Sequence, residues 1–209
     1  MSPDPTARNP IVPDTKDWTW TTRRRCAECG FDASVVAAAD LADLLASLTA
    51  PWQDVLVRED VGQRPEPTTW SPLEYACHIH EVLDVFAGRF ELILAEDDPT
   101  LPNWDQDVAS LDGAYAAQDP AVIAREIPER TTALVAVLAR FDGTGHPEGV
   151  QDLYENAGKA CETSIFLWGR RARRSDGAEF TALSLARYLV HDLAHHLHDV
   201  GAGDRVPRS

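Results

Sequence analysis

The chain has 209 residues, 44% of them hydrophobic and 25% charged, and its formal net charge is −15. This length suits one well-buried domain or at most two small ones. The negative charge argues against nucleic acid and anionic membranes as partners, and no run of about 18 apolar residues predicts a transmembrane helix. The first residues lack the apolar core of a signal peptide, so we expect a cytoplasmic protein with a small-molecule ligand.

The first part of the chain predicts an irregular arm followed by a short helix. Residues 1–31 contain four prolines and two tryptophans, Trp18 and Trp20. Asp32 is a good N-cap for a helix whose apolar residues continue at helical spacing to Leu48. Pro51 should interrupt that helix.

The clearest helix start lies at Ser71. Ser71 is a favoured N-cap, Pro72 suits the first helical position, and Glu74 completes a capping box. The apolar spacing that follows predicts a helix to about Ala95. The segment 97–113 is acidic and carries two prolines, so we expect a long loop there.

A third helix should begin at Asp119-Pro120 and run to about Arg140, with a kink at Pro128. The segment 150–174 predicts only short helical pieces.

The segment 175–177, Ser-Asp-Gly, predicts a turn. The last helix should run from about Phe180 to Val200, where Gly201 closes it.

Four long amphipathic segments without strand alternation or internal repeats predict an all-α protein, a four-helix bundle with long loops. The predicted organisation is an irregular N-terminal arm over 1–31, a bundle over 32–200 and a tail over 201–209. Such a bundle can pair as a homodimer through exposed apolar faces.

Four of the seven histidines lie within residues 191–198. His191 and His195 are four residues apart, so on a helix they lie one turn apart on one face and can hold one metal ion. His78, beside the apolar stripe of its helix, is the predicted third ligand. His196 is rotated by about 100° from His195, and His80 points away from His78, so neither is expected to join them. The predicted ion is a divalent metal, zinc first and nickel or iron second.

The cysteines are Cys26, Cys29, Cys77 and Cys161. Cys26 and Cys29 have zinc-knuckle spacing, but no second CxxC or histidine pair follows closely. We expect a turn with small, half-buried thiols, with a structural zinc site as the alternative. A thioredoxin-like redox site is not expected, because no βαβ pattern surrounds the pair.

Two helix motifs resemble the DinB superfamily. The sequence Trp-Ser-Pro-Leu-Glu-Tyr-Ala-Cys-His over 70–78 resembles its second helix, and His191-x-x-x-His195 resembles its last helix. The resemblance covers about residues 30–200. It implies a DinB/YfiT-like four-helix bundle with a three-histidine metal site. Known members include thiol-dependent S-transferases and a maleylpyruvate isomerase that use bacillithiol, mycothiol or similar cofactors.

The resemblance implies a metal-dependent enzyme that activates a low-molecular-weight thiol, of the mycothiol or bacillithiol type, for S-transfer or isomerisation. Substrate contacts would come from the loops at the open end, from Trp104 and from Arg173 or Arg174. Two alternatives remain open. One is a metal-dependent hydrolase, and the other is a non-catalytic stress-response module that binds a metal or a small ligand.

Overall fold

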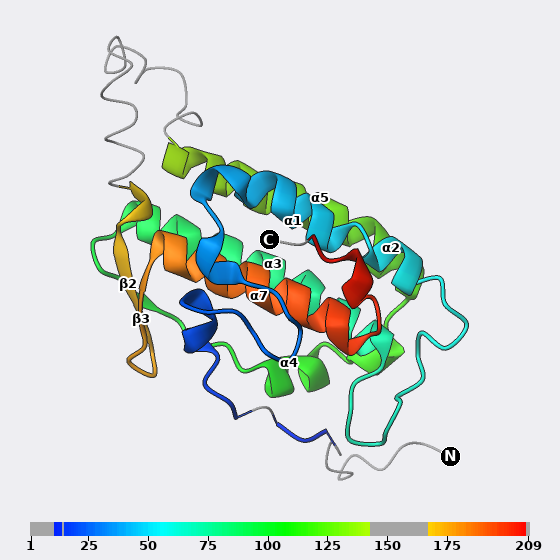
Figure 1. The fold of residues 1–209 in the computed structure, drawn as a ribbon. Helices are drawn as coiled ribbons and strands as arrows, with labels where there is room; N and C mark the ends of the chain where they lie inside the picture. Colours follow the sequence, from blue (N-terminus) through cyan, green and yellow to red (C-terminus); the bar gives the residue numbers. More distant parts are fainter. Residues whose placement is uncertain (1–10, 14, 143–166, 208–209) are drawn as a thin grey trace.

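The computed structural model describes residues 11–13, 15–142 and 167–207. Its helices pack as a bundle in which the last helix contacts the first and the second long helix, and the second long helix contacts the third (Figure 1). The four are α1 (Leu41–Thr49), α3 (Pro72–Ala95), α5 (Pro120–Ala139) and α7 (Ala182–Asp199). A further turn, α2 (Trp52–Val55), follows α1 after Pro51. The predicted four-helix bundle is therefore confirmed.

The predicted start of α3 is confirmed by its capping contacts. The Ser71 hydroxyl accepts a hydrogen bond from the backbone N–H of Glu74 at 3.2 Å, and the Glu74 carboxylate accepts one from the N–H of Ser71 at 2.8 Å. Thr181 and Ser184 form the equivalent box at the start of α7. The starts of α3 and α7 are thus determined locally by the sequence.

The first helix begins later than predicted. Asp32 does cap the N–H of Ser34, but it starts only a short 3-10 helix, Ala33–Val35. Val36 is extended, and its carbonyl accepts a hydrogen bond from Arg187 Nε of α7 at 3.0 Å. This tertiary contact uses the carbonyl that a continuous helix would need, so α1 starts at Leu41.

Pro128 does not interrupt α5. A proline lacks the N–H that would bond the carbonyl four residues earlier, which is that of Ala124. Here Gln53 Nε2 donates to the Ala124 carbonyl at 2.6 Å and satisfies it from α2. The helix therefore continues through the proline as one element.

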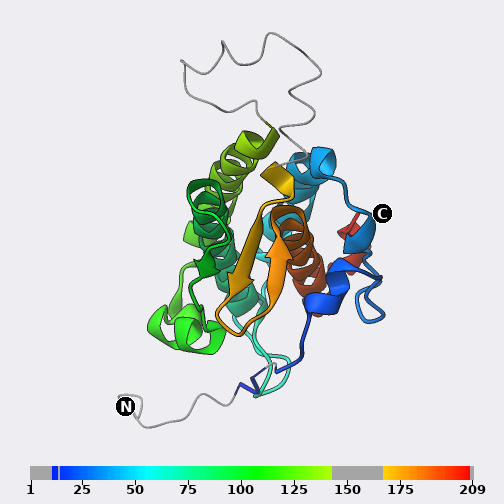
Figure 2. The ribbon, with the colours of Figure 1, turned by 90° about the vertical axis from the view of Figure 1, so that its left-hand side faces the viewer.

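The expectation of no strands was wrong. A small sheet covers one end of the bundle, where Figure 2 shows β2 and β3 in front of α7. Its strands are β1 (Thr100–Leu101), β2 (Arg171–Arg174) and β3 (Glu179–Thr181). β1 pairs parallel to β2, and β2 pairs antiparallel to β3 across the predicted turn, where Gly177 has φ +91°. These strands are too short to produce a visible alternation, although Ala172 and Phe180 point inward and are buried.

The predicted loop 97–113 contains a short helix, α4 (Gln106–Asp112). Asp105 caps it by accepting hydrogen bonds from the N–H groups of Asp107 and Val108. Residues 143–166, which include Cys161 and most of the segment predicted to form short helical pieces, lie outside the described residues.

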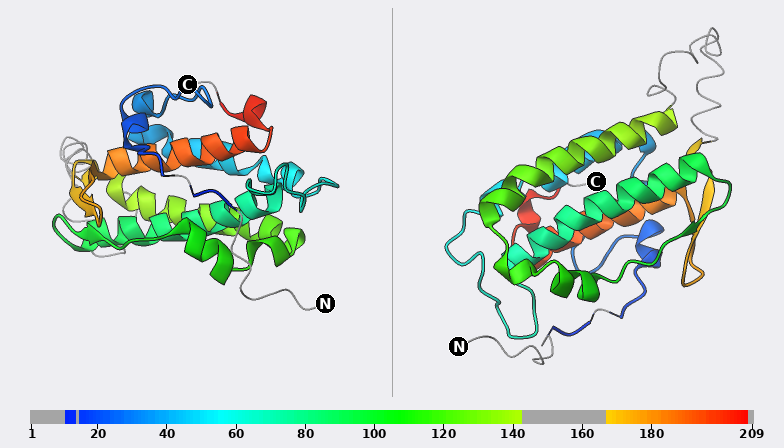
Figure 3. Two further views of the ribbon diagram at one scale, coloured as in Figure 1. Left: turned by 90° about the horizontal axis from the view of Figure 1, so that it is seen from below. Right: turned by 180° about the vertical axis from the view of Figure 1, so that it is seen from behind.

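The core lies between the long helices and includes the fully buried Leu83, Phe90, Ile127, Leu134 and Leu193. The described part of the arm runs along α7, and its 3-10 helix, Thr19–Thr22, packs on that helix (Figure 3). Within the described ranges, none of the helices is both long and apolar enough to cross a membrane.

Candidate metal centres

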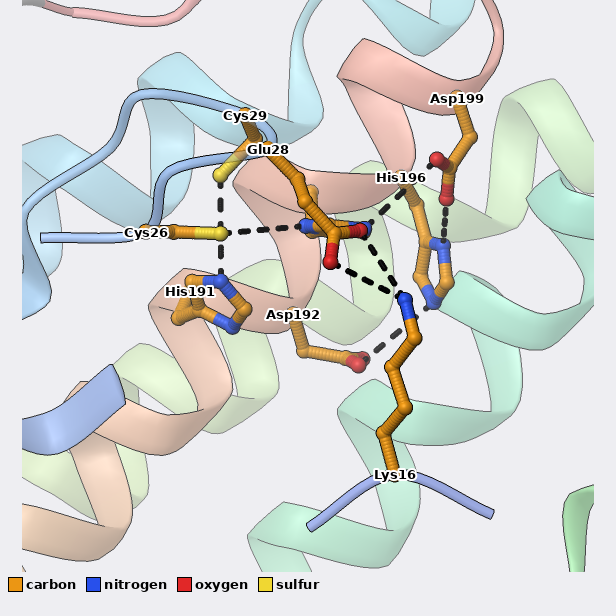
Figure 4. Close-up of polar contacts among 9 residues, drawn as sticks. Lys16, Cys26, Glu28, Cys29, His191, Asp192, His196 and Asp199 are labelled. Carbon is orange, nitrogen blue, oxygen red and sulfur yellow. Dashed lines mark hydrogen bonds and ion pairs between the residues drawn. The ribbon is translucent and has the colours of Figure 1, made fainter. Parts of the chain in front are cut away.

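Helix α7 carries two pairs of potential ligands that are offset by one residue. His191 and His195 form one pair, and Asp192 and His196 form the other. Because successive helical residues are rotated by about 100°, the two pairs occupy neighbouring stripes of one helix. Figure 4 shows His191 facing the cysteines of the arm, whereas Asp192 and His196 face away from them. Two ligand groups follow, one on each stripe.

One ligand group consists of His78 from α3 with Asp192 and His196 from α7. One ligand atom from each lies within 4.8 Å of the others. His78 Nε2 is 3.5 Å from Asp192 Oδ2, and His196 Nε2 is 3.5 Å from Asp192 Oδ1. Two imidazole nitrogens and a carboxylate thus converge from two facing helices, as in an open three-ligand site.

The imidazole of His78 is an orphaned buried group. It is 1% exposed, its Nδ1 has no hydrogen-bond partner among the described residues, and its Nε2 lies 3.5 Å from Asp192 Oδ2 without forming a hydrogen bond. Burial lowers the pKa of His78, so the ring is neutral near pH 7. A buried neutral imidazole without a partner fits a metal ion, which would satisfy it.

Carboxylates orient His196 and favour its charged form. His196 Nδ1 donates to Asp199 Oδ2 at 2.8 Å, which leaves Nε2 to face Asp192. Burial opposes protonation of His196, but Asp192 and Asp199 together raise its pKa to about 10. Burial also disfavours the charged form of Asp192, yet His196 and His78 hold its pKa well below the usual range. Without a metal His196 is therefore protonated near pH 7, and a metal ion bound at Nε2 would displace that proton, while Asp199 would support the ring from Nδ1.

This group lies where two cavities meet. A cavity of about 700 Å³ is lined by His196, and a smaller one of about 200 Å³ is lined by His78. Asp192, Trp104, Arg174 and Tyr188 line both. The ligand group therefore faces space large enough for a small molecule.

Two arginines stand beside the ligands. Arg174 bonds Asp176 Oδ2 through Nε and Nη2 at 3.0 and 2.6 Å, and its Nη1 is 3.5 Å from the Tyr188 hydroxyl. Arg89 lines the smaller cavity and is 8% exposed, and its Nε has no hydrogen-bond partner in the described part of the chain. The cavity therefore offers a buried guanidinium to an anionic group.

The other ligand group consists of Cys26 and Cys29 of the arm with His191 and His195 of α7. Cys26 Sγ lies 3.8 Å from His195 Nδ1, and Cys29 Sγ lies 3.8 Å from His191 Nε2. One ligand atom from each of the four lies within 4.8 Å of the others. Burial lowers the pKa of His191 to about 4, so this imidazole is neutral near pH 7.

The three histidines predicted to share one metal do not lie in one ligand group. The structure places His78 with Asp192 and His196, and it places His191 and His195 with Cys26 and Cys29. His196 does point away from His195, as predicted. It lies on the stripe of α7 that faces His78.

The remaining residues that the sequence analysis considered lie partly at the cavities and partly away from them. Trp104 stacks on His78 with ring centroids 5.3 Å apart, and Arg174 lines both cavities. Arg173 lines neither and pairs with Asp98 at 2.6 Å on the exposed side of the sheet. His80 contacts Glu126 of α5 at 2.7 Å, away from both groups.

Two signals in the sequence pointed to the candidate ligands that the prediction did not include. Asp192 and His196 repeat the i, i+4 spacing of His191 and His195 one residue later. A lone CxxC supplies two of the four ligands of a tetrahedral site, and a lone HxxxH supplies the other two. The cysteine pair and the histidine pair lie 162 or more residues apart, so only tertiary packing brings them together.

Comparison with known proteins gives a likeness in fold. No protein-family model matches the chain, and no curated protein sequence matches it. The structure resembles that of YfiT from Bacillus subtilis, described as "a probable metal-dependent hydrolase with an unusual four-helix bundle topology", with a TM-score of 0.61 and 15% sequence identity. The match covers 82% of this chain and 89% of YfiT. The chain therefore has the YfiT-like four-helix bundle fold that its helix motifs implied.

Proposed function

We propose that the protein is a metal-dependent enzyme whose divalent metal is held by His78, Asp192 and His196. The observation that carries this proposal is the convergence of three ligands, one of them an orphaned buried imidazole, at the junction of two cavities. Three protein ligands leave a position for a reactant, which is the arrangement of catalytic rather than structural sites. Zinc is the first candidate, with nickel or iron next.

The reactant that we favour at this position is a low-molecular-weight thiol, used for S-transfer or isomerisation. A divalent metal held there lowers the pKa of a bound thiol or water and so supplies a nucleophile near neutral pH. The cavity of about 700 Å³ beside His196 has room for a thiol cofactor as well as its acceptor.

The surrounding residues would bind and orient the acceptor. Arg89 and Arg174 place positive charge beside His78, which suits an acceptor with a carboxylate or a similar anionic group. Burial raises the pKa of Tyr188, so its hydroxyl keeps its proton and can donate a hydrogen bond. Trp104 covers the face of His78 and limits the access of water to that ring.

Hydrolysis is the second candidate, because the likeness in fold is to a protein described as a probable metal-dependent hydrolase. The same ligands and the same open position would then serve water instead of a thiol.

The test compares the wild-type protein with His78→Ala, His196→Ala and the control His198→Ala, an exposed histidine at the end of α7. Each metal-loaded protein is incubated with mycothiol, bacillithiol or glutathione and a panel of carboxylated electrophiles, and thiol loss is followed. We expect thiol consumption by the wild type and His198→Ala that falls at least about 100-fold in the other two.

Activity that survives in His78→Ala would overturn the assignment of the metal site. Hydrolysis of an ester or amide panel without thiol consumption, lost in the same two variants, would select the second candidate.

A further inference from the structure

The proposed catalysis does not use the four side chains that join the arm to α7. Each cysteine of the arm faces one histidine of α7, at 3.8 Å in both cases. In a tetrahedral zinc site, bond lengths near 2.3 Å to sulfur and 2.05 Å to nitrogen separate neighbouring sulfur and nitrogen atoms by about 3.6 Å. The observed spacing is thus within a few tenths of an ångström of that of a filled site.

The backbone of the arm is folded to present both thiols on one side. Cys26 N–H donates to the Phe31 carbonyl at 2.9 Å, and Gly30 N–H donates to the Cys26 carbonyl at 3.0 Å. Gly30 has φ +76°, a conformation that glycine adopts without strain. The turn is closed by its own hydrogen bonds, and Figure 4 shows both thiols directed at α7.

Two of the four side chains are buried and an aromatic ring packs on the histidines. Cys26 is fully buried and His191 is 3% exposed. Trp18 lies against both histidines, with its ring centroid 5.5 Å from that of His191 and 4.8 Å from that of His195. His191 and His195 line the 700 Å³ cavity, but four protein ligands would fill the tetrahedral coordination of a zinc ion and leave no position for a reactant, unlike the three ligands around His78.

Carboxylates back the outer nitrogen of His195. Its Nε2 lies 3.7 Å from Asp199 Oδ1 and 3.9 Å from Glu28 Oε2, while Nδ1 faces Cys26. Glu28 is in turn paired with Lys16 at 3.0 Å. Carboxylate behind a histidine is the usual support of a zinc ligand.

We propose that Cys26, Cys29, His191 and His195 hold a structural zinc ion that fixes the arm to α7, separate from the metal on His78, Asp192 and His196. Two thiolates and two neutral imidazoles cancel the charge of one Zn²⁺, which suits a buried site. Binding displaces one proton from each thiol to solvent, and no electron is transferred.

The zinc ion would also shape the cavity of the proposed enzyme. Lys16, Trp18 and Glu28 of the arm line the same 700 Å³ cavity as His196. By fixing Cys26 and Cys29 on α7, the ion would hold this wall of the cavity in place.

The test uses zinc-loaded and cobalt-substituted full-length protein. The variants are Cys26→Ser, Cys29→Ser and the control Cys77→Ser, whose sulfur lies in α3 and contacts the Tyr115 carbonyl. We expect two metals per chain in the wild type and Cys77→Ser, and about one in the other two. Cobalt in the wild type should show a thiolate-to-metal charge-transfer band, which the Cys26 and Cys29 variants lose.

The spectrum of the cobalt-substituted protein also distinguishes the two metal sites. His78→Ala should lose one metal but keep the charge-transfer band, because no sulfur ligand belongs to that group. Should the serine variants fail to fold, Cys29→His keeps four ligands and should retain the metal with a weaker band. A wild type without the band, unchanged metal content in Cys26→Ser, or a Cys26–Cys29 disulfide in the metal-loaded protein would overturn the proposal.

Discussion

His195 and His196 are consecutive in the chain, but their rings lie 6.2 Å apart at 83° to one another and belong to different ligand groups. The rotation of about 100° between successive helical residues produces this separation. One turn of α7 thus contributes to both proposed metal sites, the zinc site on the arm side and the catalytic site on the α3 side. A change in the rotation of α7 would disturb both sites together.

Asp199 should influence both sites, since one carboxylate oxygen lies 2.8 Å from His196 Nδ1 and the other 3.7 Å from His195 Nε2. We expect Asp199→Asn to weaken metal binding at both sites by roughly 10- to 100-fold, as loss of carboxylate support does elsewhere. Competition titrations with a chelator, read by cobalt spectra, measure each site. Glu28→Gln is the control, because Glu28 contacts only His195 of the two histidines. Wild-type affinity in Asp199→Asn would contradict this role.

Gly30→Ala should destabilise the proposed zinc site through the backbone alone. An added Cβ would meet nothing within 4 Å, but φ is +76°, which costs an alanine about 1 kcal/mol. Gly62→Ala is the matched control, since its added Cβ also meets nothing and its φ lies outside the left-handed region. Zinc affinity should fall in Gly30→Ala and stay unchanged in Gly62→Ala. Equal affinities in both variants would show that the turn at Gly30 does not position the thiols.

Arg89→Met should stabilise the protein. Burial, followed by the nearby charge of Arg174, lowers the pKa of Arg89, and its Nε is unsatisfied among the described residues. Replacing a poorly paired buried charge by an apolar side chain should raise the free energy of unfolding by about 1–3 kcal/mol in urea titrations. Arg187→Met is the contrasting variant and should lower it by about 1–2 kcal/mol, because the Val36 carbonyl loses its donor. A destabilised Arg89→Met protein would mean that Arg89 is structural rather than a ligand-binding charge.

Glu74→Gln should reveal a pH-dependent contribution to stability. Burial opposes the charge of Glu74, but Arg64 and the N–H of Ser71 lower its pKa overall. The contribution is therefore fully present above the unfolded pKa of about 4.3 and is lost as the pH falls through the lower folded value. We expect the variant to be less stable by roughly 2 kcal/mol between pH 6 and 8, since it loses the charge that Arg64 binds.

Urea unfolding of both proteins from pH 7 to pH 3 measures this difference. Acid also releases metal, but it does so in both proteins, so the difference isolates Glu74. The gap should close below about pH 4. A gap that widens in acid would contradict the lowered pKa.

The fold was predictable because its signals are local. Ser71 and Glu74 mark the start of α3 within four residues, and the apolar spacing of the long segments identified the bundle. β1 and α4 were not predicted, since elements of two and seven residues carry too little periodicity.

The ligand sets were less predictable than the helices. The spacing of His191 and His195 showed that they share a face, but the element opposite that face depends on tertiary packing. Asp192 and His196 occupy the stripe that meets His78, so the residues grouped with His78 in the structure differ from those that the one-helix argument selected. A ligand pair on one helix is visible in sequence, whereas its partner on another element is not.

The pairing of Cys26 with His195 has a consequence for how the protein is made. The two residues are 169 positions apart, so a ribosome must synthesise the chain through α7 before the proposed zinc site can close. Until α7 emerges, the two thiols have only the arm to hold them and are open to oxidation to a disulfide. Once bound, the ion would close a loop that spans the whole bundle, and closing a longer loop removes more entropy from the unfolded chain. A shortage of zinc during synthesis would then lower the yield of folded protein.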